Sequence, residues 1–302
     1  MTPEKDNNKL TFPQFDVVSD MLDYHFLGRD LLRQMENRFL RAISKEWRIL
    51  QENLPESIFV WVFETRSDLL RAAIIGAAGT PYHDALFFFD IGLPPNYPNE
   101  PPKVHYLSHG YQVNPNLYNN GTVCLSLLNT WMGWSRKRWN PKMSTLLQVL
   151  LSIQSLVLNE KPYFNDPLTF VNSKKLSTDY SQNVFSLTCM TTVHLIRKPP
   201  RKFEPLIKHH FRQRANVILA ACDAYANGRV MVGFHGCDGA APPRFEIRLS
   251  FQTNMERVFA YLVFEFRRIE AGVPPGSERL VVISTKKPKG IFRRMIKNMG
   301  CF

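Results

Sequence analysis

The sequence predicts an α+β fold, in which helices flank an antiparallel sheet and a basic, helix-rich extension follows. Three observations lead to this class. An amphipathic helical pattern precedes four short strand-like runs, and further helical patterns follow them. The charge is also uneven, since residues 1–190 contain 18 Lys and Arg against 18 Asp and Glu, whereas the remainder contains 20 against 8. The whole formal net charge of +12 therefore lies in the last third of the chain.

The first predicted helix covers residues 36–52. Its apolar residues recur at intervals of three or four, with basic residues between them. The apolar stripe comprises Phe39, Ile43, Trp47 and Leu50. We expect this stripe to face the core.

Four runs rich in aliphatic or aromatic residues follow, separated by turn signals, and they predict an antiparallel meander. They cover residues 58–63, 70–75, 85–91 and 103–106. Five prolines between residues 94 and 102 exclude a helix interior or a central strand, so we expect an ordered loop there. Residues 113–139 lack a periodic pattern, which predicts irregular structure.

The next elements are predicted to be helical. Ser144 is an N-cap candidate for an apolar helix that reaches about residue 158. A further helix covers about residues 174–196, and another begins at Pro205 and ends at Gly228.

Two further patterns follow toward the C-terminus. Residues 245–251 alternate as a strand would, and residues 255–269 have a helical pattern. We divide the chain into an N-terminal extension at 1–35, a central domain at 36–196 and a basic C-terminal extension at 197–302.

The segment with the clearest chemical signal is the one that contains Cys124. It holds the amide of Asn116 eight residues before this cysteine, across a turn that contains Gly121. A cysteine thiolate can accept an acyl group, and a fixed amide N–H can stabilise the oxyanion that forms when an amine attacks the thioester. The alternative is a buried structural cysteine, because free cysteine behaves as a small hydrophobe.

Four sequence blocks surround this segment in a fixed order. They are Gly79-Thr80-Pro81-Tyr82 continuing to Ile91, the proline-rich stretch 97–104, Trp139-Asn140-Pro141, and Asn165-Asp166-Pro167-Leu168. In this order the blocks resemble the catalytic domain of ubiquitin-conjugating enzymes, over about residues 36–196. The resemblance is closest to large, plant-like members with long extensions. In those members Asn-Pro-Asn often replaces His-Pro-Asn and the cysteine is followed by Leu-Ser-Leu-Leu, as it is here.

The resemblance implies the ubiquitin-conjugating-enzyme fold: an N-terminal helix, a four-stranded antiparallel meander and C-terminal helices. It also implies roles for three residues. Cys124 would accept ubiquitin as a thioester from an activating enzyme, Asn116 would donate to the oxyanion, and Asp166 would orient the attacking lysine and help to collect its proton. Asn116 and Asp166 could instead be turn residues only.

The resemblance implies neither a cofactor nor a bound metal. The carboxyl group arrives already activated, and no GxxxxGK[ST] phosphate loop occurs in the sequence. Zinc is disfavoured because the candidate ligands contain no CxxC pair. These candidates are His209, His210, Cys222, His235 and Cys237.

Three residues and one loop depart from the family pattern. Asn114 replaces the usual histidine, and we expect it to organise the loop through Asx-type contacts. Asn99 and Lys142 stand where many members carry a large apolar and a small residue, which puts common ligase contacts in doubt. The lengthened loop at 131–138 is either a solvated insertion or a direct selector of substrates, as in members that combine conjugating and ligase activities.

The expected partners are ubiquitin, its activating enzyme and a protein substrate, while the need for a separate ligase stays open. No membrane partner is expected, because residues 1–10 are polar and the apolar run at 146–158 is short and interrupted. Five cysteines without a paired spacing favour a reducing compartment, hence the cytoplasm. A basic cluster at 286–294 leaves nuclear import as an alternative.

Two other classes of function stay open at this point. A non-catalytic variant would use the fold only for binding, but the joint presence of Cys124, Asn116 and Asp166 argues against it. A nucleic-acid-binding module is supported by the basic last third alone, so we do not expect nucleic acid as a partner.

Overall fold

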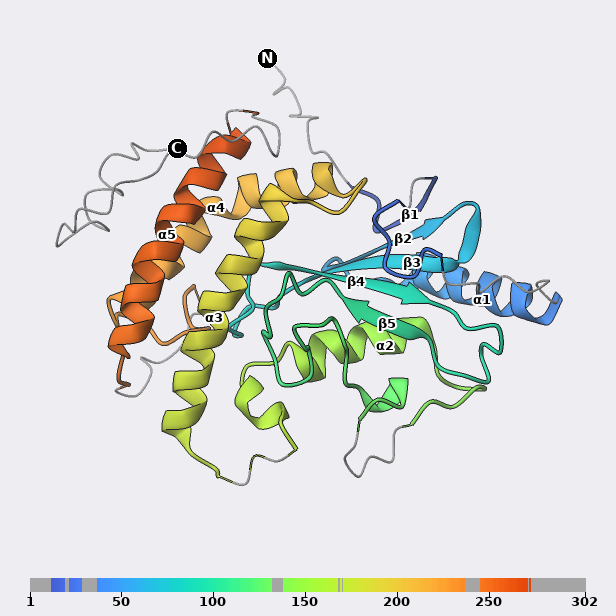
Figure 1. The fold of residues 1–302 in the computed structure, drawn as a ribbon, viewed down its shortest axis with the longest axis horizontal. Coiled ribbons are helices and arrows are strands. Elements are labelled where there is room, and N and C mark those ends of the chain that lie inside the picture. The colour runs from blue at the N-terminus through green and yellow to red at the C-terminus, as the bar shows by residue number, and fades with distance from the viewer. Residues whose placement is uncertain are drawn as a thin grey trace, which may run out of the picture.

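The computed structural model describes most of the chain (Figure 1). The described residues are 12–19, 22–28, 37–131, 138–167, 169, 171–236, 245–270 and 272. Most of the lengthened loop, the basic cluster at 286–294, Cys237 and Cys301 lie outside them.

A five-stranded sheet with the order β1-β2-β3-β4-β5 forms the centre of the structure. Its strands are β1 (Phe15–Val18), β2 (Ile58–Phe63), β3 (Arg66–Ile75), β4 (Leu86–Gly92) and β5 (Lys103–Tyr106). The pairs from β2 to β5 are antiparallel, which confirms the predicted meander. The first strand was not predicted; it runs parallel to β2, with Phe15 opposite Val60.

The first hydrophobic core lies between one face of the sheet and two helices, α1 (Asn37–Asn53) and α2 (Leu146–Ser152). Alternate sheet residues such as Val60, Ala72 and Phe87 point into it, because side chains alternate between the faces of a strand. Buried Glu46 of α1 also accepts a hydrogen bond from the Leu146 amide at the start of α2 (2.9 Å). This contact satisfies one of the N-terminal amides that a helix leaves free.

The start of α2 corrects one prediction, since its N-cap is Thr145 and not Ser144. Thr145 Oγ1 accepts from the Gln148 amide (3.2 Å), and the Gln148 side chain accepts from the Thr145 amide (3.3 Å), which forms a capping box. The Ser144 hydroxyl accepts instead from the Asn140 amide (3.0 Å). The helix continues into a π-helical turn, η2 (Ile153–Val157).

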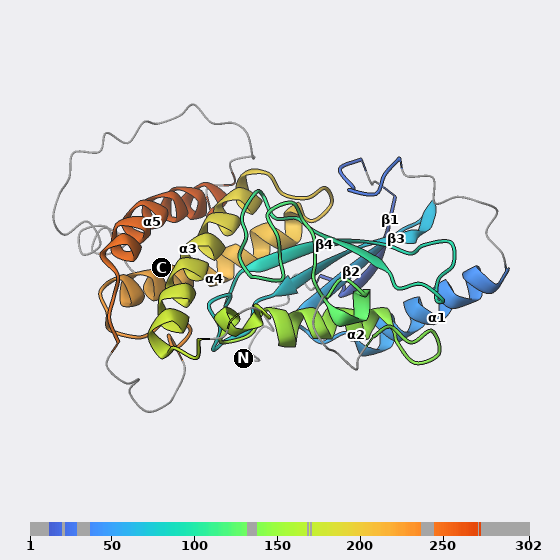
Figure 2. The same cartoon turned by 60° about the horizontal axis from the view of Figure 1, so that its bottom comes forward.

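The second core lies on the other face of the sheet, where Trp61, Ala73 and Phe88 meet three helices. These are α3 (Lys174–Arg197), α4 (Glu204–Ala226) and α5 (Leu249–Glu270). They lie together at one end of the sheet, whereas α1 lies toward the opposite end (Figures 1 and 2). The Trp61 ring stacks on Phe203, just before α4, with 3.9 Å between ring centroids. Helices from both sides of the predicted boundary at residue 197 therefore share one core.

The strand predicted at 245–251 is wrong, because residues 245–248 form no regular element and α5 begins at Leu249. The Gln182 side chain makes the backbone hydrogen bonds that a neighbouring strand would make. Gln182 of α3 donates to the Glu246 carbonyl (2.9 Å) and accepts from the Arg248 amide (3.2 Å). The helix predicted at 255–269 is confirmed as part of α5.

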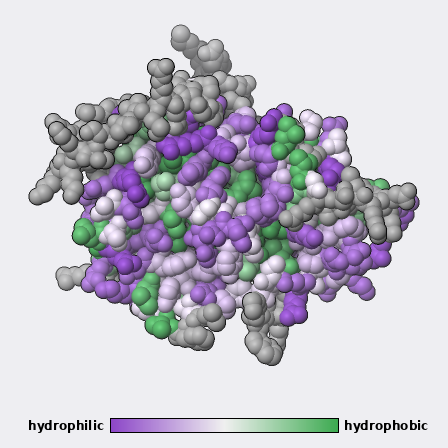
Figure 3. All heavy atoms as spheres, in the orientation of Figure 1, coloured by the Kyte–Doolittle hydropathy of each residue, from purple (hydrophilic) through white to green (hydrophobic). Residues whose placement is uncertain are grey.

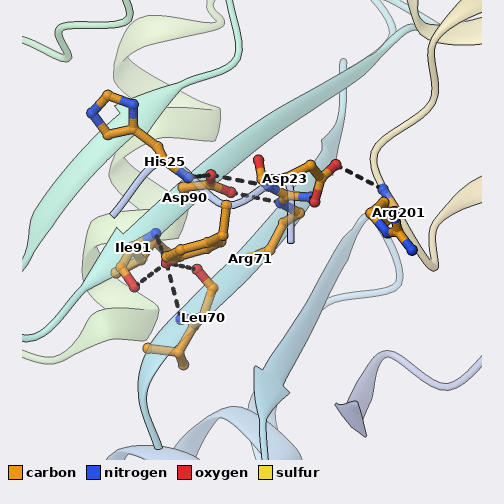
Figure 4. Close-up of polar contacts among 8 residues, drawn as sticks. Asp23, His25, Leu70, Arg71, Asp90, Ile91 and Arg201 are labelled. Atoms are coloured by element: carbon orange, nitrogen blue, oxygen red, sulfur yellow. Dashed lines mark hydrogen bonds and ion pairs between the residues drawn. The ribbon is translucent and has the colours of Figure 1, made fainter. Parts of the chain in front are cut away.

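Buried polar contacts join the N-terminal segment to the sheet (Figure 4). Arg71 on β3 stands opposite Asp90 on β4 and makes a bidentate pair with it, at 2.6 and 3.0 Å. Asp23 accepts from the Arg71 guanidinium (2.9 Å) and from the backbone amide of Arg201 (2.9 Å), which precedes α4. The His25 amide donates to Asp90 (2.8 Å). The segment before the sheet and the segment before α4 thus meet at one charged group in the sheet.

A second polar cluster joins the turn between β3 and β4 to α4. The His83 ring bonds to the Asp84 carboxylate (2.7 Å) and to the Tyr225 hydroxyl (2.9 Å). Arg214 donates to the same carboxylate (2.7 Å). This turn belongs to the first of the four sequence blocks, so the block also anchors the C-terminal extension.

The surface of the described residues is mixed in character. On the face shown in Figure 3, their hydrophobic side chains are scattered among hydrophilic ones. None of the described helices combines the length and the apolar character needed to cross a membrane.

Candidate active site

Cys124 and Asn116 are brought together by a tight reversal of the chain after β5. The Cys124 amide donates to the Asn116 carbonyl (2.9 Å), and Leu117 forms an isolated antiparallel bridge with Val123. Gly121 closes the reversal with φ at 86°, where a Cβ would strike the His105 ring. Only glycine fits this position. The eight-residue spacing seen in the sequence therefore corresponds to two residues that pair directly.

The thiol of Cys124 is partly exposed and forms no disulfide. Its buried neighbours Val123 and Leu125 are fixed by one hydroxyl. Thr130 Oγ1 donates to the Val123 carbonyl (2.7 Å) and accepts from the Leu125 amide (3.0 Å). Because both neighbours are anchored, the sulfur is held at the surface in a defined direction. The alternative of a buried structural cysteine does not fit this placement.

Asn116 is buried at the same reversal. Its side-chain amide has no hydrogen-bond partner among the described residues, so its N–H groups are available to a ligand. Its backbone amide donates to the side-chain oxygen of Asn114 (2.9 Å), which is an Asx-type contact. The expectation that Asn114 organises the loop is therefore confirmed. The side-chain amide of Asn114 donates to the Val157 carbonyl (2.7 Å) and to the Tyr82 hydroxyl (2.7 Å).

Asp166 directly follows the short helix η3 (Pro162–Asn165). Its backbone carbonyl accepts from the Thr169 amide (3.0 Å), so it does occupy a turn. The charge of Asp166 also contributes to the raised pKa of Tyr118, which lies in the reversal that holds Cys124. The structural and chemical roles considered for this residue are thus compatible.

Tyr118 is a site residue that the sequence reasoning missed. Its amide donates to the Thr122 carbonyl (3.0 Å) within the reversal, and the pKa of Tyr118 is raised, first by Cys124, then by burial and by the charge of Asp166. The spacing alone gave no signal for this residue, because Asn116 lies in a turn and only the folded reversal places Tyr118 in the same loop. Tyr118 therefore belongs to the electrostatic surroundings of Cys124.

The two other departures lie on exposed, adjoining loops. Asn99 lies in a turn, and its backbone amide donates to the Asn96 carbonyl (2.7 Å). The backbone amide of Lys142 donates to the Asn140 side-chain oxygen (2.9 Å). Trp139 joins the loops by donating to the Pro98 carbonyl (2.6 Å). Both departures therefore present polar side chains on neighbouring, hydrogen-bonded loops.

The candidate zinc ligands are dispersed. Cys222 lies beside Cys189 in the core, with 3.9 Å between the sulfurs, and burial raises its pKa. His210 bonds to the Asp84 carbonyl (2.8 Å). Across the described part of the chain, no three His, Cys, Asp or Glu side chains gather as a metal site would require.

Comparisons show which known proteins the chain is similar to. A family model described as "Ubiquitin-conjugating enzyme" matches residues 42–190. The probable ubiquitin-conjugating enzyme E2 24 of Arabidopsis thaliana is 52% identical over 233 residues, which cover 74% of this chain and 26% of that protein. The putative ubiquitin-conjugating enzyme E2 39 of the same plant is 42% identical over 275 residues, covering 86% and 84%.

A more distant relative combines two activities in its name. The dual E2 ubiquitin-conjugating enzyme/E3 ubiquitin-protein ligase BIRC6 of Homo sapiens is 36% identical over 241 residues, which cover 72% of this chain and 5% of that protein. The chain spans 21% to 37% of the length of three of its Arabidopsis relatives.

Proposed function

Because the chain belongs to the ubiquitin-conjugating enzyme family, we propose that it accepts ubiquitin on Cys124 and transfers it to a substrate lysine. The observation that carries this proposal is the chain reversal at the site. It pairs a partly exposed thiol with a buried amide that has no hydrogen-bond partner among the described residues. Such a pair suits the formation and the aminolysis of a thioester.

The first step is a thioester exchange. The Cys124 thiolate attacks the ubiquitin carbonyl carbon, a new C–S bond forms, and the thiolate of the activating enzyme leaves. The exchange needs no further activation of the carboxyl group, because one thioester replaces another. The anchored neighbours of Cys124 keep the sulfur accessible to so large a donor.

The second step is aminolysis. The uncharged lysine nitrogen attacks the thioester carbon, and negative charge develops on the carbonyl oxygen. We assign the stabilisation of that oxygen to the side-chain amide of Asn116. Asp166 orients the amine and helps to remove its proton. Collapse of the intermediate breaks the C–S bond, releases the Cys124 thiolate and leaves an isopeptide bond.

The proposed partners are ubiquitin, a ubiquitin-activating enzyme and a protein substrate. The polar surface at Asn99 and Lys142 supports reduced dependence on ligases that grip an apolar residue there. Substrate selection by this chain itself is consistent with the name of its dual-activity relative. We keep the cytoplasm as the proposed location, with nuclear entry as the alternative.

A single-turnover discharge experiment tests this function. The protein is charged with ubiquitin, charging is quenched, and loss of the thioester is followed after addition of free lysine. Asn116→Ala should charge normally but discharge roughly 100-fold more slowly. Asp166→Ala should discharge roughly 10- to 100-fold more slowly, with the deficit narrowing at higher pH.

The matched control is Asn119→Ala, an exposed amide in the same reversal, which should behave as wild type. Equal discharge by wild type and Asn116→Ala would remove Asn116 from the mechanism. Failure of folded wild type to accept ubiquitin would overturn the function itself.

A further inference from the structure

We propose that Asn165 is a positioning residue that holds the Asn116 side of the site in register with the Asp166 side. This inference rests on the proposed function. The structure joins the two sides through a compact set of side-chain amides. We call Asn114, Asn165 and Asn159, with the Val157 carbonyl, the amide brace.

The first connection is a shared acceptor. Asn114 is fully buried, and its side-chain oxygen accepts two hydrogen bonds. One comes from the Asn116 backbone amide (2.9 Å) and the other from the side-chain amide of Asn165 (3.3 Å). An amide oxygen has two lone pairs, so both can be accommodated. The Asn116 backbone and the Asn165 side chain are therefore linked through a single shared acceptor, the side-chain oxygen of Asn114.

The second connection is the Val157 carbonyl. It accepts from Asn114 (2.7 Å) and from Asn165 (2.9 Å). Val157 ends the π-helical turn η2, and carbonyls at a helix end lack partners within the helix. The two side-chain amides therefore converge on two shared oxygens, which ties the catalytic reversal to the end of the helix.

The third connection fixes the orientation of Asn165 itself. Its side-chain oxygen accepts from the amide of Asn159 (2.6 Å). Since both ends of the Asn165 side chain are engaged, the amide cannot flip without losing contacts. Asn165 directly precedes Asp166, so a fixed side chain at 165 also fixes where the backbone delivers the carboxylate.

This arrangement matters most for aminolysis. In that step Asn116 must contact the carbonyl oxygen while Asp166 contacts the attacking lysine. Charging does not use the Asp166 carboxylate. A misplacement of about 1 Å in such a site can cost on the order of 100-fold in rate. The brace should therefore affect discharge to lysine far more than charging.

The test compares charging and single-turnover lysine discharge for Asn165→Ala, with thermal unfolding as a folding control. Discharge should fall roughly 10- to 100-fold while charging stays within about twofold. The deficit should narrow as pH rises toward the lysine pKa near ~10.4, because a free amine depends less on Asp166. Asn159→Ala removes only the orienting contact and should give a smaller loss, about two- to fivefold. Asn119→Ala is the matched exposed control.

A double-mutant cycle makes the test specific. In an Asp166→Ala background, adding Asn165→Ala should slow discharge by less than about threefold, because the group being positioned is gone. Full additivity would overturn the proposal, as would a parallel loss of charging, discharge and thermal stability. Unchanged discharge in Asn165→Ala would overturn it while leaving the proposed function intact. Failure of wild type to charge would instead overturn the function on which it rests.

Discussion

Removal of Asp90 should destabilise the protein strongly, because it breaks a buried ion pair. The side chains of Arg71 and Asp90 are only 2% and 1% exposed, and their bidentate contact is 2.6 Å at its shorter bond. Asp90→Ala leaves the buried guanidinium with Asp23 as its remaining carboxylate partner in this network. Breaking a buried pair in this way costs about 3–5 kcal/mol. The melting temperature should therefore fall by roughly 6–20 °C.

Two companion variants separate charge from packing. Asp23 is 35% exposed, so Asp23→Ala should cost only about 1 kcal/mol. The double variant Arg71→Met/Asp90→Leu removes both charges and keeps apolar volume, so it should recover most of the stability lost in Asp90→Ala.

Urea unfolding followed by circular dichroism is the suitable assay, because guanidinium salt would screen the charges. The reasoning would be refuted if Asp90→Ala unfolded within about 1 kcal/mol of wild type. It would also be refuted if the double variant were as unstable as Asp90→Ala, because packing and not an unpaired charge would then explain the loss.

Three further predictions concern other parts of the molecule. Phe203→Ala should cost about 3–5 kcal/mol and lower the single unfolding transition of the whole protein in calorimetry; two separate transitions would show that the extension folds alone. Burial, with His194 and Lys198 nearby, lowers the pKa of His109 to about 4. An unfolded imidazole has a pKa of ~6.5, so below that pH the unfolded state binds a proton that the folded state excludes. The free energy of unfolding should therefore fall as the pH is lowered from ~6.5 to about 4, by up to ~1.4 kcal/mol per pH unit. His109→Gln should reduce this fall, as measured by urea unfolding at each pH. Tyr118→Phe removes the hydroxyl whose pKa Cys124 raises, and it should slow lysine discharge by up to about fivefold in the single-turnover assay; an unchanged rate would exclude a role for this hydroxyl.

Local patterns were sufficient to predict most elements of the fold. The helix at 36–52 and the four antiparallel strands were predicted because apolar periodicity and turn residues are properties of neighbouring positions. The strand β1 escaped prediction because its parallel partner lies more than 40 residues away, at Val60. The strand predicted at 245–251 failed because Gln182, from a distant helix, satisfies that backbone.

In the candidate site, too, the features set by nearby residues were predictable and those set by distant residues were not. Cys124 and Asn116 were identified from their types and spacing, and their backbone contact gives that spacing a physical meaning. The amide brace was not predictable as a unit, because Asn165 contributes to it only through a fold that brings η3 beside the catalytic reversal. The sharing of one core by helices α3 to α5 likewise depends on which sheet face remains open, and periodicity does not reveal that.

The most direct measurement of the central claim is a charging assay. Wild type and Cys124→Ser are incubated with activating enzyme, ubiquitin and ATP, then separated on non-reducing and reducing gels. The account predicts a thiol-sensitive ubiquitin adduct on wild type, and on Cys124→Ser either a thiol-stable ester or no adduct. A thiol-sensitive adduct on Cys124→Ser, or no adduct on folded wild type, would contradict it.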